Sequence, residues 1–138
     1  MLDKYELSIV DCNRCIDDNS EDYESYSQRG LCYFYQDKYE LAILDFNKCI
    51  EVNAEDYECY MKRSGCYRGQ GKYDLAILDL TTCININSED YASYNQRGIC
   101  YISQKKYDLA LLDFNKAILL NDNEITFYYN RSFCYLRQ

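Results

Sequence analysis

The sequence predicts an all-α fold, a solenoid of antiparallel helix pairs, from its internal repetition and its composition. Its 138 residues align with themselves at a step of 34, with no insertion or deletion. A fixed period of this length indicates stacked units that cannot each bury an apolar face alone. The chain has no proline and only 5 glycines, so few residues interrupt helices. The aligned positions include three series: Tyr26, Tyr60, Tyr94 and Tyr128; Arg29, Arg63, Arg97 and Arg131; Asp11, Asp45, Asp79 and Asp113.

A cysteine series recurs at half that step and divides each unit into two similar halves, most simply two antiparallel helices. Alanine replaces cysteine at one position, which indicates that these sites require a small apolar side chain. The series consists of Cys15, Cys32, Cys49, Cys66, Cys83, Cys100, Ala117 and Cys134.

The first full repeat shows why each half is expected to be a helix. Ser20 is the predicted N-cap, and the acids that follow it suit the positive end of the helix dipole. Apolar and aromatic residues then recur at helical rather than alternating spacing. The second helix is predicted to begin near Tyr39, to bury Ala42 and Phe46, and to end at Asn53, because asparagine tolerates the left-handed conformation.

Extending this assignment along the repeat predicts eight helices whose short connections make sequential neighbours antiparallel. Their ranges are 4–18, 22–36, 39–52, 56–70, 73–86, 90–104, 107–120 and 124–137. We expect a single array with partial units at 1–22 and 125–138 and full units at 23–56, 57–90 and 91–124. Because neither partial unit brings a polar capping helix, the array is expected to belong to a longer one or to self-associate head to tail.

Charge and hydropathy exclude several classes of function. The net charge of −8 and the pI near 4.5 argue against nucleic-acid binding, which depends on Lys and Arg neutralising phosphates. No charged-then-apolar segment opens the chain, and apolar stretches are only a few residues long. We therefore expect no membrane span and a cytoplasmic location.

The nine cysteines follow the helical repeat, so we interpret them as small buried hydrophobes. Redox sensitivity and metal binding are the alternatives. Cys12 and Cys15 form a lone C-x-x-C inside a predicted helix, and the chain has no histidine and no second cysteine pair at metal-ligand spacing. The sequence therefore predicts no metal site and no cofactor.

The combined pattern resembles the tetratricopeptide repeat, a 34-residue helix-turn-helix unit, over the whole chain. In the first full unit the matching residues are Tyr26, Gly30, Tyr33, Tyr39, Ala42, Phe46 and Cys49. The next two units match at Tyr60, Ser64, Tyr67, Tyr73, Ala76, Leu80 and Cys83, and at Tyr94, Gly98, Tyr101, Tyr107, Ala110, Phe114 and Ala117. Two departures leave the predicted fold intact: the family's proline between units is missing, and arginine replaces the leucine before the glycine.

The resemblance implies a right-handed superhelical α-solenoid in which the first helix of each unit lines a concave groove that binds a peptide or protein segment. Residues on this inner face differ from unit to unit, whereas the tyrosine, cysteine, arginine and aspartate series do not. The candidate groove residues are Glu24, Ser27, Gln28, Leu31, Phe34, Tyr35, Glu58, Met61, Lys62, Arg68, Asn95, Gln96, Ile99, Ile102, Tyr129, Asn130 and Phe133.

The groove chemistry predicts an apolar segment with an acidic group as the partner, the acid meeting Lys62 or Arg68. In the subfamily that grips the acidic tails of heat-shock chaperones, lysine and asparagine on the first groove helix, asparagine on the next, and lysine with arginine on the third form a clamp. The matching positions hold Glu24, Gln28, Lys62, Ala92 and Gln96, or one unit later Glu58, Lys62, Gln96, Thr126 and Asn130. Neither register supplies the clamp.

The arginine and aspartate series are expected to pair and to set the stacking register. Pairing to the preceding unit, as in Asp11 with Arg29, satisfies all four arginines, whereas pairing within a unit strands Asp11 and Arg131. We therefore predict partly buried ion pairs between units, with solvated charges as the alternative.

Two aliphatic series fall on the outer face of the second helices. Core packing is expected for at least one of them, and exposure of both would create a lateral interaction surface. The series are Leu7, Leu41, Leu75 and Leu109, followed by Val10, Leu44, Leu78 and Leu112.

These patterns favour a non-catalytic interaction scaffold that binds a peptide or protein in the groove. The alternative is a structural element whose terminal helices stack head to tail with other copies. An enzyme is not expected, because the chain has no histidine, no glycine-rich phosphate loop and no nucleophile beside a base.

Overall fold

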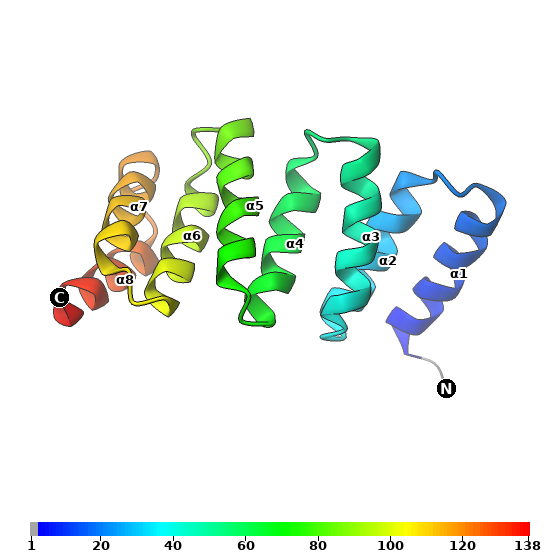
Figure 1. Ribbon diagram of the computed structural model, residues 1–138, viewed down its shortest axis with the longest axis horizontal. Coiled ribbons are helices and arrows are strands. Elements are labelled where there is room, and N and C mark those ends of the chain that lie inside the picture. The colour runs from blue at the N-terminus through cyan, green and yellow to red at the C-terminus, as the bar shows by residue number, and fades with distance from the viewer. Residues whose placement is uncertain (1–2) are drawn as a thin grey trace. The chain divides into compact units, whose positions relative to one another are not determined.

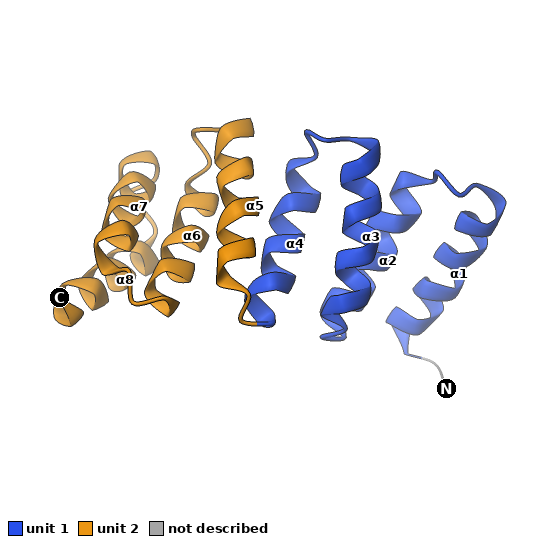
Figure 2. Ribbon diagram, viewed as in Figure 1, with its two compact units in different colours: residues 1–70 blue, residues 71–138 orange. Residues whose placement is uncertain are grey.

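The computed structural model describes residues 3–138, which form eight α-helices and no strand. Two compact units, residues 1–70 and 71–138, divide the chain (Figure 2). The first unit contains α1 (Lys4–Asp18), α2 (Tyr23–Tyr35), α3 (Tyr39–Val52) and α4 (Tyr57–Gly69), and the second contains α5 (Tyr73–Ile86), α6 (Tyr91–Ser103), α7 (Tyr107–Leu120) and α8 (Ile125–Arg137). The odd-numbered helices have the predicted bounds, and the even-numbered helices are shorter than predicted by one residue at one or both ends.

Within each unit the helices pack in chain order (Figure 1). In the first unit each helix contacts the next, and α2 also reaches α4. The second unit repeats this arrangement, with α6 also reaching α8. Ala42 and Phe46 of α3 are buried at the centre of the first core, as predicted, and Ala110 and Phe114 of α7 occupy the same place in the second. Each core is therefore built around the second helix of a repeat.

Aspartate holds the N-cap position of α2, α4 and α6, so the prediction of Ser20 as N-cap is wrong. Asp56 accepts a hydrogen bond from the backbone N–H of Cys59, at 2.9 Å, and Asp90 caps α6 in the same way. Asp22 holds the N-cap position of α2, where its carboxylate accepts from the Ser25 hydroxyl at 2.6 Å. Aspartate, rather than serine, is the N-cap because it lies one residue before the first helical turn, whose N–H groups need acceptors.

Asparagine ends the odd-numbered helices, but the predicted left-handed conformation is wrong. Asn53 is extended, with φ −134° and ψ 97°. Its side-chain oxygen accepts from the backbone N–H of Glu55 at 3.1 Å, which makes an Asx turn. Asn19, Asn87 and Asn121 make the same bond two residues on. The side chain, rather than the backbone conformation, thus turns the chain towards the next helix.

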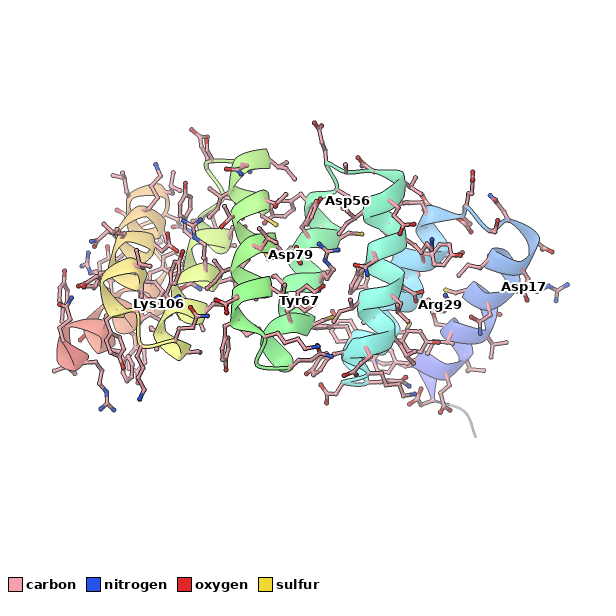
Figure 3. The ribbon with its side chains drawn as sticks, viewed as in Figure 1. Asp17, Arg29, Asp56, Tyr67, Asp79 and Lys106 are labelled. Carbon is pink, nitrogen blue, oxygen red and sulfur yellow. The ribbon has the colours of Figure 1, made fainter. Side chains whose placement is uncertain are left out.

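Arg29 and Arg97 pair with aspartate within a repeat, so the prediction of pairing to the preceding repeat is wrong. Arg29, labelled in Figure 3, donates from Nε and Nη2 to the two carboxylate oxygens of Asp45, at 2.9 and 2.7 Å. Its third nitrogen, Nη1, donates to Asn13 of the preceding repeat at 2.5 Å. Arg97 makes the same bidentate pair with Asp113, at 2.8 Å for both bonds, and its Nη1 reaches Thr81 at 3.0 Å.

A planar guanidinium explains this geometry, because it presents a fork to one carboxylate and a further N–H on its other side. Arg29 and Arg97 therefore each link two repeats, although the acceptor in the preceding repeat is an amide or hydroxyl rather than a carboxylate. Partial burial is confirmed, since 19% of the Arg29 side chain and 5% of the Asp45 side chain are exposed. Arg131 shares the bond to the preceding repeat and donates to Asn115 at 2.9 Å.

Both aliphatic series on the odd-numbered helices are exposed, so the prediction that one of them packs in the core is wrong. Leu41 is 44% exposed and Leu44 is 62% exposed. The corresponding residues of α1, α5 and α7 are also exposed. The reason is that an odd-numbered helix buries its alanine and aromatic positions against the even-numbered helices and leaves the opposite face outside.

All nine cysteines, which lie within residues 12–134, are thiols rather than disulfides, and only Cys15 is exposed. Burial raises the pKa of Cys83 to about 12. The hydrogen bond that the Cys59 thiol donates to Cys49, together with burial, raises the pKa of Cys59. The structure therefore agrees with the interpretation of the series as small core residues, except at Cys15, which is exposed. Among the described residues no cluster of cysteine and carboxylate side chains is arranged to hold a metal ion.

We expect a thiol reagent at pH 8 to label Cys15 rapidly in the folded protein and the other cysteines only after unfolding. Thiolate, not thiol, is the reactive form. The buried thiols are inaccessible, and burial in addition raises the pKa of Cys83 to about 12. Mass spectrometry after brief iodoacetamide treatment counts the labelled sites, and Cys15→Ser should abolish the rapid phase. Rapid labelling of Cys83 would contradict this account.

Candidate functional site

The candidate groove residues lie on the even-numbered helices, and all of them are exposed or half-buried. In the first unit, α2 presents a hollow of ≈ 240 Å³ lined by Tyr23, Glu24, Ser27, Gln28 and Leu31. The Asp22 and Asp56 N-caps begin α2 and α4 at equivalent repeat positions, so the two helices carry their variable side chains in the same register. This hollow brings together four of the residues that the sequence singled out.

Aromatic side chains lie at the C-terminal end of α2. Phe34 packs against α4 at Gly65, where an added Cβ would lie 3.1 Å from the ring. Its neighbour Tyr35 is 57% exposed and stacks on Tyr5 of α1, with ring centroids 5.8 Å apart. Leu31 also packs against the core of this unit. Leu31 and Phe34 thus support the fold as well as facing the candidate site, whereas Tyr35 offers an open ring.

Charge on the first unit's candidate face alternates in sign. Glu24 of α2 and Glu58 of α4 are exposed, while Met61, Lys62 and Arg68 of α4 are half-buried. Arg68 lies in the last turn of α4, where the helix dipole favours a cation. Half-burial lets the long lysine and arginine stems cover apolar surface while their charged ends stay in contact with water. This face can meet both an apolar side chain and an acidic one.

The second unit carries a more amide-rich candidate face. Asn130 of α8 donates from Nδ2 to Oδ1 of Asn95 on α6, at 3.1 Å. Ile99 and Ile102 pack against the core, and Gln96 is half-buried beside them on α6. Paired amides keep unused donors and acceptors, so they can bond to an extended peptide backbone.

Towards the end of α8 the second unit's face becomes aromatic. Tyr129 is 71% exposed, and the guanidinium of Arg137 lies 5.2 Å from the centre of the half-buried Phe133 ring. A cation over an aromatic face is a favourable contact. This end of the face therefore combines an open phenol with a positive charge.

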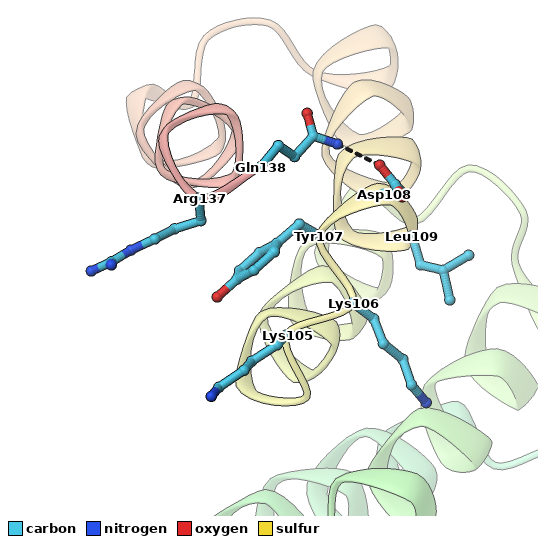
Figure 4. A pocket seen from close by; sticks show the side chains of 7 residues that line it. All are labelled: Lys105, Lys106, Tyr107, Asp108, Leu109, Arg137 and Gln138. Atoms are coloured by element: carbon cyan, nitrogen blue, oxygen red, sulfur yellow. Dashed lines mark hydrogen bonds between the residues drawn. The ribbon is translucent and has the colours of Figure 1, made fainter.

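A basic hollow at the turn between α6 and α7 was missed by sequence reasoning. Its volume is ≈ 510 Å³, and Figure 4 shows its lining side chains. They are Lys105, Lys106, Tyr107, Asp108, Leu109, Arg137 and Gln138. The amide of Gln138 donates to Asp108. The signal was present in the repeat alignment, because Lys105 and Arg137 stand where the preceding repeat has Gly71 and Ser103.

The fold and these faces define a helical-repeat protein in which each repeat presents one variable helix. Family models described as tetratricopeptide repeat match residues 23–56, 57–90 and 91–124, which is more than half of the chain. The chain belongs to the tetratricopeptide repeat family. A search of curated proteins finds no match to it.

Solved structures of tetratricopeptide domains share the fold at low sequence identity. A crystal structure of MamA superposes with a TM-score of 0.89 at 18% identity and covers 99% of this chain and 85% of that one. The first tetratricopeptide domain of Spaghetti (RPAP3), bound to an HSP90 peptide, gives a TM-score of 0.79 at 20% identity, covering 86% and 94%. The second such domain of human RPAP3, in complex with an HSP70 peptide, gives 0.76 at 24%, covering 80% and 92%.

Within the described residues, no helix is both long and apolar enough to cross a membrane.

Proposed function

We propose that this protein is a non-catalytic interaction scaffold that binds a peptide or protein segment on the inner faces of its even-numbered helices. The observation that carries the proposal is the contrast between an invariant framework and a variable, solvent-accessible face. The arginine, aspartate and core positions repeat and are engaged in packing, while the face of α2 differs from that of α6 and is open. Two structural neighbours are tetratricopeptide domains with peptides bound, which supports the same class of function.

The chemistry of the faces defines the kind of segment expected. Leu31, Tyr35 and Phe133 are suited to apolar or aromatic side chains, and Lys62 is suited to a carboxylate. The amide pair Asn95–Asn130 is suited to backbone groups of an extended chain. Because the chain lacks the lysine and asparagine clamp in either register, we do not propose an acidic chaperone tail as the ligand.

We expect Lys62→Glu to weaken binding of an acidic peptide at least tenfold, and Glu24→Lys to strengthen or redirect it, with the free energy of unfolding changed by less than about 0.5 kcal/mol. Both side chains lie on the candidate face, and neither is buried. Peptides are first selected on the wild-type protein from a displayed random library, and their affinities for each variant are then measured by fluorescence anisotropy.

Matched charge reversals away from the face provide the control. Glu55 and Lys72 are exposed loop residues, so Glu55→Lys and Lys72→Glu alter the net charge without altering the face. Selected peptides that bind all four variants with wild-type affinity would remove these residues from the site. The alternative function is association of copies through α1 and α8. Groove substitutions would leave this association unchanged, and substitution of an exposed α8 residue such as Ile125 would abolish it.

A further inference from the structure

The outward face of α3 carries an acid, a leucine and a base at equal spacing. Glu40, Leu44 and Lys48 are four residues apart and therefore lie along one side of the helix. Leu44 is 62% exposed, the Lys48 side chain is 55% exposed, and Glu40 is also exposed. Leu41, at 44% exposure, widens the apolar part of this face. Neighbouring exposed aliphatic side chains flanked by opposite charges are a candidate interaction surface.

The order of these three residues makes the face complementary to itself. When two α3 helices lie antiparallel around a two-fold axis through Leu44, each Glu40 faces the Lys48 of the other copy. The two residues are equidistant from Leu44, about 6 Å along the helix on either side. A two-fold contact of this kind uses one surface patch on both molecules and closes on itself. We propose that the outward face of α3 is a self-association surface that pairs two copies of this chain antiparallel.

The hydrogen bonds already made by these side chains are compatible with the pairing. Gln70 donates to Oε1 of Glu40 at 2.7 Å, and a carboxylate accepts several hydrogen bonds at once. Lys48 pairs with Glu51 at 2.7 Å in an exposed ion pair, which contributes little to stability. Exchange of that ion pair for one with Glu40 of the second copy therefore costs little. Burial of Leu44 and Leu41 supplies the favourable free energy.

The other odd-numbered helices carry less complete versions of this face. On α5 a threonine, Thr82, stands where α3 has Lys48. On α1 the acid Glu6 is half-buried and its carboxylate accepts the N–H of Asp3 in a capping box. On α7 the base Lys116 is half-buried. Within residues 3–138, α3 is thus the odd-numbered helix on which the acid, the leucine and the base are all exposed.

The pairing is tested by charge reversal and mixing in the full chain. Glu40→Lys places lysines opposite each other in a pair of identical copies, and Lys48→Glu places glutamates opposite each other. Each variant alone should self-associate at least tenfold more weakly than wild type in sedimentation equilibrium at physiological ionic strength. An equimolar mixture of the two variants should associate within threefold of wild type, because every lysine then faces a glutamate.

Controls separate this surface from other contacts. The exposed pair Glu55→Lys and Lys72→Glu should leave self-association at the wild-type level, alone and mixed. Leu44→Ser should abolish it, and circular dichroism should show unchanged helix content, because Leu44 lies outside the core. The proposal is overturned if wild type stays monomeric up to millimolar concentration. It is equally overturned if the mixture associates no better than the single variants, or if the charge variants associate as wild type does.

Discussion

Replacement of Phe114 by alanine is expected to lower the free energy of unfolding by about 3–5 kcal/mol. Phe114 is fully buried in α7 and lies against Gly98 of α6, where an added Cβ would be 2.7 Å from the ring. The ring thus fills the space that the glycine leaves open, and two packed helices cannot close over the cavity that alanine creates. Denaturation in urea, followed by circular dichroism and analysed by linear extrapolation, measures the loss.

A matched control lies two residues away on the same helix. Leu112 is 66% exposed, so Leu112→Ala removes an aliphatic side chain from the outside and should change stability by less than about 0.5 kcal/mol. Gly98→Ala should be destabilising through overpacking, and Phe114→Leu in the same molecule should recover part of that loss. Equal losses for Phe114→Ala and Leu112→Ala would contradict the assignment of Phe114 to the core and of Leu112 to the outer face of α7.

This pair of leucine and phenylalanine also shows how far the sequence alone could lead. The repeat period places eight helices and identifies Ala42 and Phe46, with their equivalents, as core residues, because small and aromatic side chains recur at helical spacing. Hydrophobicity could not show that Leu41 and Leu44 are outside. A helix in a stack is covered on some sides only. Which side remains open depends on the rotation of the helix about its axis, and the hydrophobicity of a leucine does not reveal that rotation.

The arginine series illustrates a second limit of the sequence. Arg29 lies 16 residues from Asp45 in the structure's pairing, and Asp11 stands at a comparable distance on the other side. Pairing of Arg29 with Asp45 and pairing with Asp11 are both compatible with the repeat. The number of arginines that find an aspartate favoured pairing with Asp11, which is wrong. The guanidinium does not need two carboxylates, because Asp45 takes two N–H groups and a neutral acceptor, Asn13, takes the third.

The candidate groove was more accessible to sequence reasoning than the basic hollow. Variation between repeats marks Glu24 and Lys62, because these positions are free of framework contacts that would hold them constant. The hollow beside Tyr107 depends on Lys105 and Arg137, which lie far apart in the sequence. Only the stacking of α8 on α7 brings them to one place.

Removal of the Arg97 guanidinium is expected to destabilise the protein by about 3 kcal/mol, as for loss of one partner from a buried ion pair. Only 17% of the Arg97 side chain and 6% of the Asp113 side chain are exposed. Arg97→Met keeps the aliphatic stem but leaves the Asp113 carboxylate buried without its two charge-assisted hydrogen bonds. It also removes the link to Thr81 on α5. Urea denaturation of the variant measures the combined loss.

Arg131 offers a control, because it donates to an amide, whereas Arg97 donates to a carboxylate. It occupies the equivalent position on α8, stacks on Tyr128 at 5.3 Å and donates to Asn115, an exposed hydrogen bond. Arg131→Met should therefore cost less than about 0.5 kcal/mol. Substitution of both partners, Arg97→Met with Asp113→Leu, should recover most of the loss, because well-packed apolar residues replace a buried pair at little cost. Equal losses at Arg97 and Arg131 would instead assign the stabilisation to stacking on tyrosine, which the two arginines share.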